Sequence, residues 1–100
     1  METPQRIALN RTVRTLTVHW QDGRVDEFSD STLRANCPCS ACRRIRLQGG
    51  TIAIADEVAV FGIQPMGYGI QLVFSDGHSQ GIYPWVYLDA LAPRALVLQT

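Results

Sequence analysis

A chain of 100 residues has the length of one domain. Hydrophobic residues make up 46% of the sequence and charged residues 18%, a composition typical of a folded globular protein and unlike that of disordered chains. Nine arginines, with no lysine, balance nine acidic residues, and this net charge of zero argues against a protein that binds nucleic acid through its backbone phosphates.

The sequence also argues against a membrane or secreted protein. No stretch approaches the roughly 20 apolar residues of a membrane span, and residues 1–14 lack the apolar run of a signal peptide. Three cysteines are an odd number, which fits poorly with a framework of paired disulfides. We therefore expect a cytoplasmic protein with no membrane contact, in a reducing compartment where clustered cysteines bind metal or carry out redox chemistry.

The first half of the chain predicts a hairpin followed by a short helix. Residues 1–12 are polar, and we expect them to be a loose lead-in to a single domain spanning 1–100. Apolar and polar residues alternate over 14–20, which is typical of a half-buried strand. Asp22-Gly23 favours a tight turn before a returning strand at 25–28. The oxygen-bearing side chains of 29–31 can cap a short helix that leads into the cysteines.

The second half predicts further strands and a closing helix. Residues 43–57 indicate only a loop with local structure, including a helical stretch around 44–47. The later elements are strands at 58–63, 68–74 and 81–83, a second hairpin turn at Asp76-Gly77, a helix from Pro84 that Pro93 ends, and a tail at 95–100 that forms a final strand or a docked extension. The sum is a two-layer α+β domain, with an antiparallel sheet of about five strands, two Asp-Gly hairpins and one or two short helices.

One constellation carries chemistry. All three cysteines, Cys37, Cys39 and Cys42, fall within six residues in the spacing C-x-C-x2-C, and His78 follows the second hairpin turn. Zinc prefers four tetrahedral ligands drawn from cysteine thiolate and histidine nitrogen. A tight loop can direct three sulfurs to one centre, and a histidine on a rigid hairpin can supply the fourth ligand. A site with all four positions filled by protein is structural and not catalytic.

Other interpretations of the same residues stay open. The cysteines can be buried small side chains, since free cysteine packs like a small hydrophobe. Cys39 and Cys42 also form a C-x-x-C pair, although the βαβ context of redox motifs is missing. His78 by itself would suit a solvent-facing turn, and His19 falls on the polar face of its strand, where we expect a surface residue.

Two further groups of side chains favour ordinary structural roles. The arginines near the cysteines suit a solvated face that partly offsets thiolate charge better than a nucleic-acid contact; they are Arg34, Arg43, Arg44 and Arg46. The aromatic residues could form a binding patch, but their spacing with aliphatic residues indicates core packing; they are Trp20, Tyr83, Trp85 and Tyr87.

The motifs together resemble the γ-butyrobetaine hydroxylase-like N-terminal domain family, also labelled DUF971. The resemblance spans roughly residues 14–91 and rests on five segments in the family's order, V-H-W-Q-D-G at 18–23, L-R-A-N-C-P-C-S-A-C at 33–42, P-M-G-Y at 65–68, F-S-D-G-H at 74–78 and G-I-Y at 81–83. In the family's dioxygenase members this small domain precedes a catalytic jelly roll and binds a structural zinc through three cysteines and one histidine. By resemblance those ligands are Cys37, Cys39, Cys42 and His78.

The resemblance implies an accessory domain without the catalytic one. The oxygenase chemistry needs two histidines and a carboxylate on iron, and neither of the two histidines here begins an H-x-D or H-x-E triplet. We therefore expect a non-catalytic, zinc-stabilised module whose partner is a protein. One alternative is an accessory protein for iron or iron–sulfur clusters, because similar domains resemble extensions of Mrp-type P-loop ATPases and thiolates also ligate iron. Another is thiol–disulfide exchange at Cys39 and Cys42.

Overall fold

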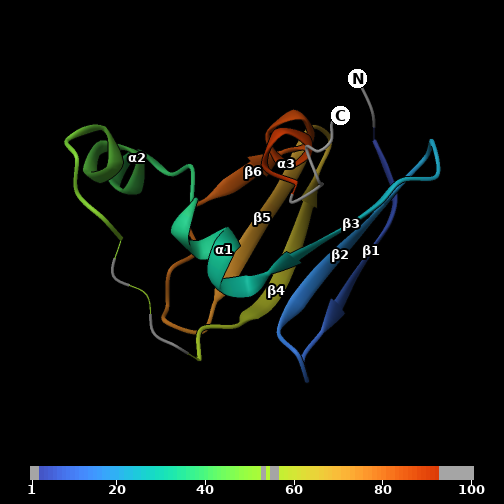
Figure 1. The fold of residues 1–100 in the computed structure, drawn as a ribbon, viewed down its shortest axis with the longest axis horizontal. Helices are drawn as coiled ribbons and strands as arrows, with labels where there is room; N and C mark the ends of the chain where they lie inside the picture. Colours follow the sequence, from blue (N-terminus) through green and yellow to red (C-terminus); the bar gives the residue numbers. More distant parts are fainter. Residues whose placement is uncertain (1–2, 53, 55–56, 93–100) are drawn as a thin grey trace, which may run out of the picture.

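The computed structural model describes residues 3–52, 54 and 57–92 and shows two small antiparallel sheets with three helices (Figure 1). The elements in chain order are β1 (Pro4–Asn10), β2 (Thr15–Trp20), β3 (Val25–Ser29), α1 (Asp30–Ala35), α2 (Ser40–Leu47), β4 (Val60–Met66), β5 (Gly69–Phe74), β6 (Ile82–Pro84) and α3 (Trp85–Leu91). The predicted α+β class is confirmed. The six strands, however, form two three-stranded sheets, β1-β2-β3 and β4-β5-β6, and not one sheet of about five.

The first sheet includes the segment that the sequence indicated as a loose lead-in, and for residues 4–10 that expectation was wrong. These residues form β1, which pairs antiparallel with β2. Ile7 and Leu9 are two residues apart and both pack against the core, so the segment alternates as a strand does. Pro4 begins this edge strand, where a missing N–H costs little.

Both Asp-Gly turns join the strands that the sequence indicated. Gly23 between β2 and β3 and Gly77 between β5 and β6 have φ values of 95° and 86°, in the left-handed region that glycine enters without a steric penalty. In the second hairpin the Phe74 N–H donates to the His78 carbonyl (2.9 Å), which fixes the turn that carries His78. Strand β4 continues through Pro65 and Met66, three residues beyond the end of the strand predicted at 58–63.

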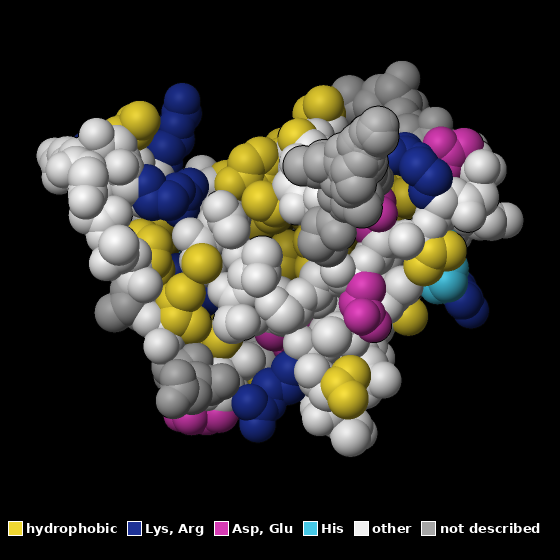
Figure 2. All heavy atoms as spheres, viewed as in Figure 1, with side chains coloured by type: hydrophobic (Ala, Val, Ile, Leu, Met, Phe, Trp, Pro, Cys, Tyr) yellow, Lys and Arg dark blue, Asp and Glu magenta, His cyan; other side chains and the backbone are white. Residues whose placement is uncertain are grey.

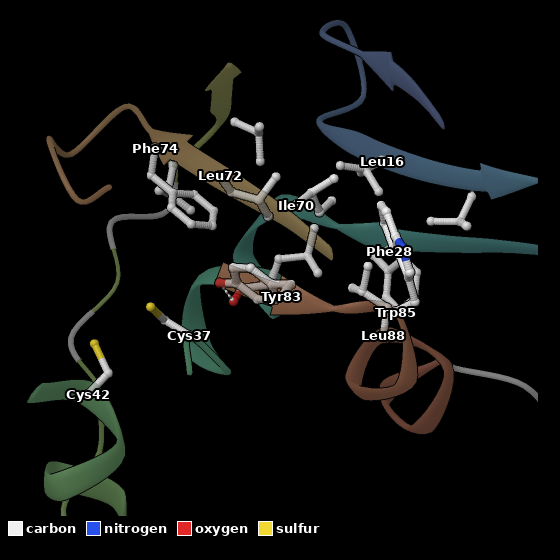
Figure 3. Close-up of a cluster of buried hydrophobic side chains, with 14 of the residues drawn as sticks. Leu16, Phe28, Cys37, Cys42, Ile70, Leu72, Phe74, Tyr83, Trp85 and Leu88 are labelled. Carbon is white, nitrogen blue, oxygen red and sulfur yellow. Dashed lines mark hydrogen bonds between the residues drawn. The ribbon is translucent and has the colours of Figure 1, made fainter. Parts of the chain in front are cut away.

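The core fills the space between the two sheets (Figure 3). Leu16, Val18 and Trp20, the apolar face predicted for the first strand, are all buried. They face buried residues of the second sheet and of the helices, which include Leu33, Ile70, Leu72, Phe74, Tyr83 and Leu88. The predicted core role of Trp20, Tyr83 and Trp85 is thereby confirmed, and Tyr87 packs partly buried against the same cluster.

The helices follow capping signals that the sequence shows only in part. The Ser29 side chain accepts from the Thr32 N–H (3.1 Å) and caps α1. Helix α2 occupies part of the segment that was expected to be mainly loop, and Cys39 is its N-cap. Pro84 is the N-cap of α3, one position before the helix. The end predicted at Pro93 and the tail at 95–100 lie outside the described residues.

No helix in this described part of the chain is both long and apolar enough to cross a membrane.

Candidate metal centre

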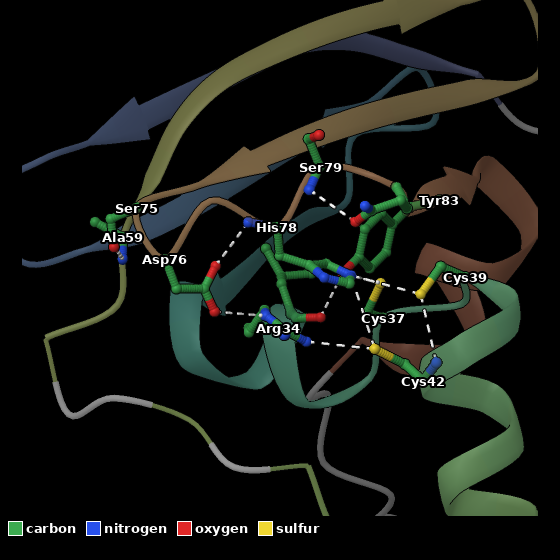
Figure 4. Close-up of polar contacts among 12 residues, drawn as sticks. Arg34, Cys37, Cys39, Cys42, Ala59, Ser75, Asp76, His78, Ser79 and Tyr83 are labelled. Atoms are coloured by element: carbon green, nitrogen blue, oxygen red, sulfur yellow. Dashed lines mark hydrogen bonds and ion pairs between the residues drawn. The ribbon is translucent and has the colours of Figure 1, made fainter.

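Three sulfurs are brought together by the loop between α1 and α2 (Figure 4). Cys37 follows α1 and is fully buried, and Cys42 lies in the first turn of α2. Cys39 is the N-cap of α2, and its Sγ accepts a hydrogen bond from the Cys42 backbone N–H at 3.4 Å. Pro38 restricts the backbone between the first two cysteines. Helix capping and a stiff loop thus direct all three side chains to one point.

His78 reaches this point from the β5–β6 hairpin. Its Nε2 lies 3.0 Å from Cys37 Sγ, 3.5 Å from Cys39 Sγ and 3.7 Å from Cys42 Sγ. All four ligand atoms lie within 4.8 Å of one another. In a tetrahedral zinc site with Zn–S bonds of about 2.3 Å and Zn–N bonds of about 2.0 Å, neighbouring ligand atoms are about 3.5–3.8 Å apart. The donor set therefore fits one ion with small adjustments.

The protonation states of the four groups respond to their surroundings in different ways. Burial raises the pKa of the Cys37 thiol to about 12 in the metal-free chain. Burial is the largest single influence on Cys39 and opposes its ionisation, but the hydrogen bonds from Cys42, Cys37 and the Ala41 backbone together outweigh burial and lower the Cys39 pKa. Burial and then the Arg34 charge lower the pKa of His78, which favours the neutral imidazole that binds metals.

Arg34 connects the sulfurs to the histidine hairpin. Its Nη1 donates to Cys42 Sγ (3.5 Å) and its Nε donates to Asp76 Oδ2 (2.9 Å). Asp76 Oδ1 in turn accepts from the His78 backbone N–H at 3.0 Å. Burial is the largest single influence and lowers the pKa of Arg34, but the hydrogen bonds and charges of Asp76 and Cys42 together outweigh burial and raise the net pKa, so the guanidinium stays charged. Expected in a solvated face, Arg34 is instead buried, while its contact with Cys42 agrees with the predicted offset of thiolate charge.

Gly81 and Tyr83 pack around the buried sulfur, whereas sequence reasoning assigned Gly81 only to a strand and Tyr83 to a strand and the core. A Cβ atom at Gly81 would lie 2.6 Å from Cys37 Sγ, so only glycine leaves room for the sulfur. The Tyr83 hydroxyl donates to the Leu33 carbonyl at 2.6 Å, which ties β6 to α1 beside the site. The signal in the sequence is weak, because one glycine in a strand has many possible reasons.

His19 is not part of the cluster. It lies on β2, and its Nε2 is 3.1 Å from Arg6 Nη2 of the neighbouring strand β1. This position agrees with the strand-face role that the alternation indicated. Of the two histidines, only His78 lies among the cysteines.

Fold and site together define a small α+β domain with a Cys3His cluster that can hold a metal ion. The family model described as "Gamma-butyrobetaine hydroxylase-like, N-terminal" matches residues 7–89. The chain belongs to this family, as the motifs had indicated.

Similar proteins agree with this membership. A crystal structure of a DUF971-family protein of unknown function from Acidithiobacillus ferrooxidans is 33% identical, with a TM-score of 0.77, and the match covers 91% of this chain and 93% of that chain. A protein structure determined in solution by NMR is 30% identical with a TM-score of 0.70, covering 90% and 70% of the two chains. Gamma-butyrobetaine dioxygenase from Pseudomonas sp. (strain AK-1) is 29% identical over 86 residues, which cover 81% of this chain and only 22% of that enzyme.

Proposed function

We propose that this domain binds one zinc ion through Cys37, Cys39, Cys42 and His78 as a structural site, and serves in the reducing cytoplasm as a non-catalytic module that binds a protein partner. The observation that carries the proposal is the convergence of four ligand atoms within 4.8 Å, from two segments far apart in the chain. A bound zinc ion would cross-link these segments and fill all its positions with protein ligands.

The chain's own residues prepare the site for such an ion. Neutral His78 presents a nitrogen lone pair, and its turn is held by the hydrogen bond from its N–H to Asp76. Three thiolates and a neutral imidazole around a divalent ion leave a net charge of minus one, which the buried Arg34 beside Cys42 would partly offset. Loss of the thiol protons on binding makes the affinity depend on pH.

One zinc ion is favoured over an iron–sulfur cluster by the spacing of the donors. A two-iron cluster divides its protein ligands between two metal atoms, whereas the four atoms here surround a single point. A single iron ion would fit the same space, so the identity of the metal is a matter for measurement.

The protein-partner role is supported by family membership. The family is described as an N-terminal domain, and this chain spans about a fifth of the dioxygenase that it matches. In such a relative the matched region is one part of a larger protein. The chain has two histidines, and one of them lies in the Cys3His cluster. Only one histidine is then left, whereas an iron site of the 2-His-1-carboxylate kind needs two.

Chelation of the purified protein tests the structural role. Removal of a structural metal should lower the melting temperature or unfold the chain, and readdition of zinc should restore it. An unchanged melting temperature after complete metal removal would contradict a structural site. Visible absorbance with bound iron and sulfide after anaerobic purification would instead support cluster handling, and rapid alkylation of Cys39 in the loaded protein would support thiol–disulfide exchange.

A further inference from the structure

Helix α2 stands apart from the two sheets, at the far left of Figure 1. Its contacts with the other described helices and strands are sparse, and Cys42 is its only buried residue. Two apolar side chains of the helix face solvent, with Leu47 77% exposed and Ile45 41% exposed. A short helix with so little packing is not stabilised by burial. Its position depends on the cysteines at its start and on a hydrogen bond from Arg46 Nη1 to the Ala35 carbonyl at the end of α1 (3.3 Å).

A hollow lies where α2 approaches β6 and α3. Its volume is about 510 Å³, within the range of ligand and side-chain binding pockets. Apolar and aromatic side chains line it, Tyr68, Ile82 and Tyr87 with two prolines, and Arg43 and Arg46 stand at its helical side. Tyr68 is 55% exposed although it is large and aromatic. The hollow therefore combines an apolar floor with a cationic rim.

A second hollow of about 420 Å³ adjoins the first. It is lined by Arg43, Arg44 and exposed Leu47 among others, and the two hollows share Pro38 and Arg43. Arg43 thus lies between the apolar first hollow and a second hollow in which Pro38 and Leu47 are the apolar side chains. An extended peptide places successive side chains on opposite sides and can fill separate pockets with alternate residues.

Charge on this surface has one sign. The chain carries no Asp or Glu between Asp30 and Asp56, and none of the described residues that line either hollow is acidic. Figure 2 shows dark blue Lys and Arg side chains gathered at the upper left over α2, beside hydrophobic side chains in a notch, with no acidic group in that part of the view. The whole chain has a net charge of zero, so this surface is a local excess of positive charge.

We propose that the surface formed by α2, Pro38, Tyr68, Ile82 and Tyr87 binds an extended acidic segment of a partner protein, with an aliphatic or aromatic side chain in each hollow and carboxylates on Arg43 and Arg44. The proposal rests on the protein-partner role and names the chemistry of that partner. Arginine suits this task because its guanidinium pairs with carboxylates in a fixed geometry. The aliphatic part of the lining, Ile82 and the two prolines, suits apolar peptide side chains, whereas the bases of single-stranded nucleic acid stack on aromatic rings.

The metal centre and this surface are coupled through α2. Cys39 caps the helix and Cys42 lies in its first turn, so any ion held by the cysteines also fixes the helix that forms one wall of the hollows. Metal removal should then weaken peptide binding even where the sheets stay folded. Peptide binding at this surface therefore depends on the metal centre.

Selection from a random peptide library displayed on phage tests the proposal without a known partner. Zinc-loaded protein is the bait, and the double variant Arg43→Glu/Arg44→Glu is the counter-selection. Both arginines are exposed, and metal content and melting temperature show whether the variant stays folded. Arg6→Glu/Arg11→Glu is the matched control, because it makes the same charge change at exposed positions on the first sheet and the turn that follows β1.

The expected result is enrichment of peptides with interleaved acidic and apolar residues. Their affinity should fall at high salt, fall at least about tenfold in the Arg43→Glu/Arg44→Glu variant, fall on chelation, and stay unchanged in the control. Enrichment of peptides without acidic residues, or of peptides that the Arg43→Glu/Arg44→Glu variant binds equally well, would refute acidic-peptide binding at this surface. The protein-partner role would remain. No enriched peptide, tighter binding of single-stranded nucleic acid, or self-association lost in the variant would each overturn the acidic-peptide assignment.

Discussion

Replacement of Gly81 by alanine should weaken metal binding, because the added methyl group meets a sulfur of the site. The Cβ atom would lie 2.6 Å from Cys37 Sγ and 3.2 Å from the ring carbon Cε1 of Tyr83. Ordinary van der Waals contacts between heavy atoms lie near 3.5–4.0 Å, so the sulfur must move by about 1 Å. Without metal, Cys37 can turn to another rotamer, whereas a bound ion holds its sulfur in place. The strain therefore falls mainly on the metal-bound form.

The size of this effect follows from the cost of overpacking. Extra methyl groups in packed interiors cost about 1–3 kcal/mol, which corresponds to a metal dissociation constant about 5- to 150-fold larger. Competition with a chromophoric chelator measures that constant. Gly67→Ala is the matched control, since nothing lies within 4 Å of its added Cβ. Equal metal affinities for the two variants would refute the assignment of Cys37 as a ligand held beside Gly81.

Three further substitutions test other parts of the structure. Asp76→Ala should lower the unfolding free energy of the metal-loaded protein by about 1–3 kcal/mol in urea titrations, because it leaves the buried Arg34 without its carboxylate partner; a loss no larger than that of an exposed carboxylate would contradict this network. Burial raises the pKa of Asp30 above 3.8, so the stability it contributes is present below pH 3.8 and is lost as pH rises through the folded-state pKa. Asp30→Asn should not show that loss, and parallel slopes of stability against pH for the two proteins would be evidence against it. Tyr83→Phe should cost about 0.5–1.5 kcal/mol in the same titrations, because the hydroxyl donates to the Leu33 carbonyl in the core; an unchanged midpoint would show that this hydrogen bond adds nothing.

Local signals in the sequence were sufficient for the hairpins and for the grouping of the cysteines. Asp22-Gly23 and Asp76-Gly77 specify turns because each glycine adopts a positive φ. Strand β2 was visible because its alternation places Leu16, Val18 and Trp20 on one buried face. These patterns depend on neighbours in the chain, so they need no knowledge of the fold.

Pairing and packing at long range were not visible in the same way. Strand β1 alternates over only a few residues and is stabilised as an edge strand by β2, a partner that composition does not reveal. The strands form two sheets because β3 and β4 do not pair with each other, and the sequence of each strand does not reveal this. The helical stretch predicted around 44–47 is the second half of α2, but the start of this helix was not visible because Cys39 is an unusual N-cap, whose sulfur accepts the hydrogen bond that an oxygen commonly accepts.

The sequence predicted the four ligand residues of the site but not the residues that hold them in place. Three cysteines in six residues and a turn histidine suggested one centre, and the four side chains lie together in the fold. The roles of Arg34, Asp76 and Gly81 depend on contacts between the β5–β6 hairpin and the segment that contains α1 and the cysteines. Arginine at a helix end and glycine in a strand are common, so their sequence context alone does not distinguish these roles.

Metal content is the most direct measure of the central claim. Elemental analysis should be made on anaerobically purified wild-type protein and on the Cys39→Ser and His78→Ala variants. We predict one zinc ion per wild-type chain and loss of zinc in both variants, because each removes one of four ligands around a single ion. Wild-type protein without metal, or variants that keep the full amount, would contradict the Cys3His site.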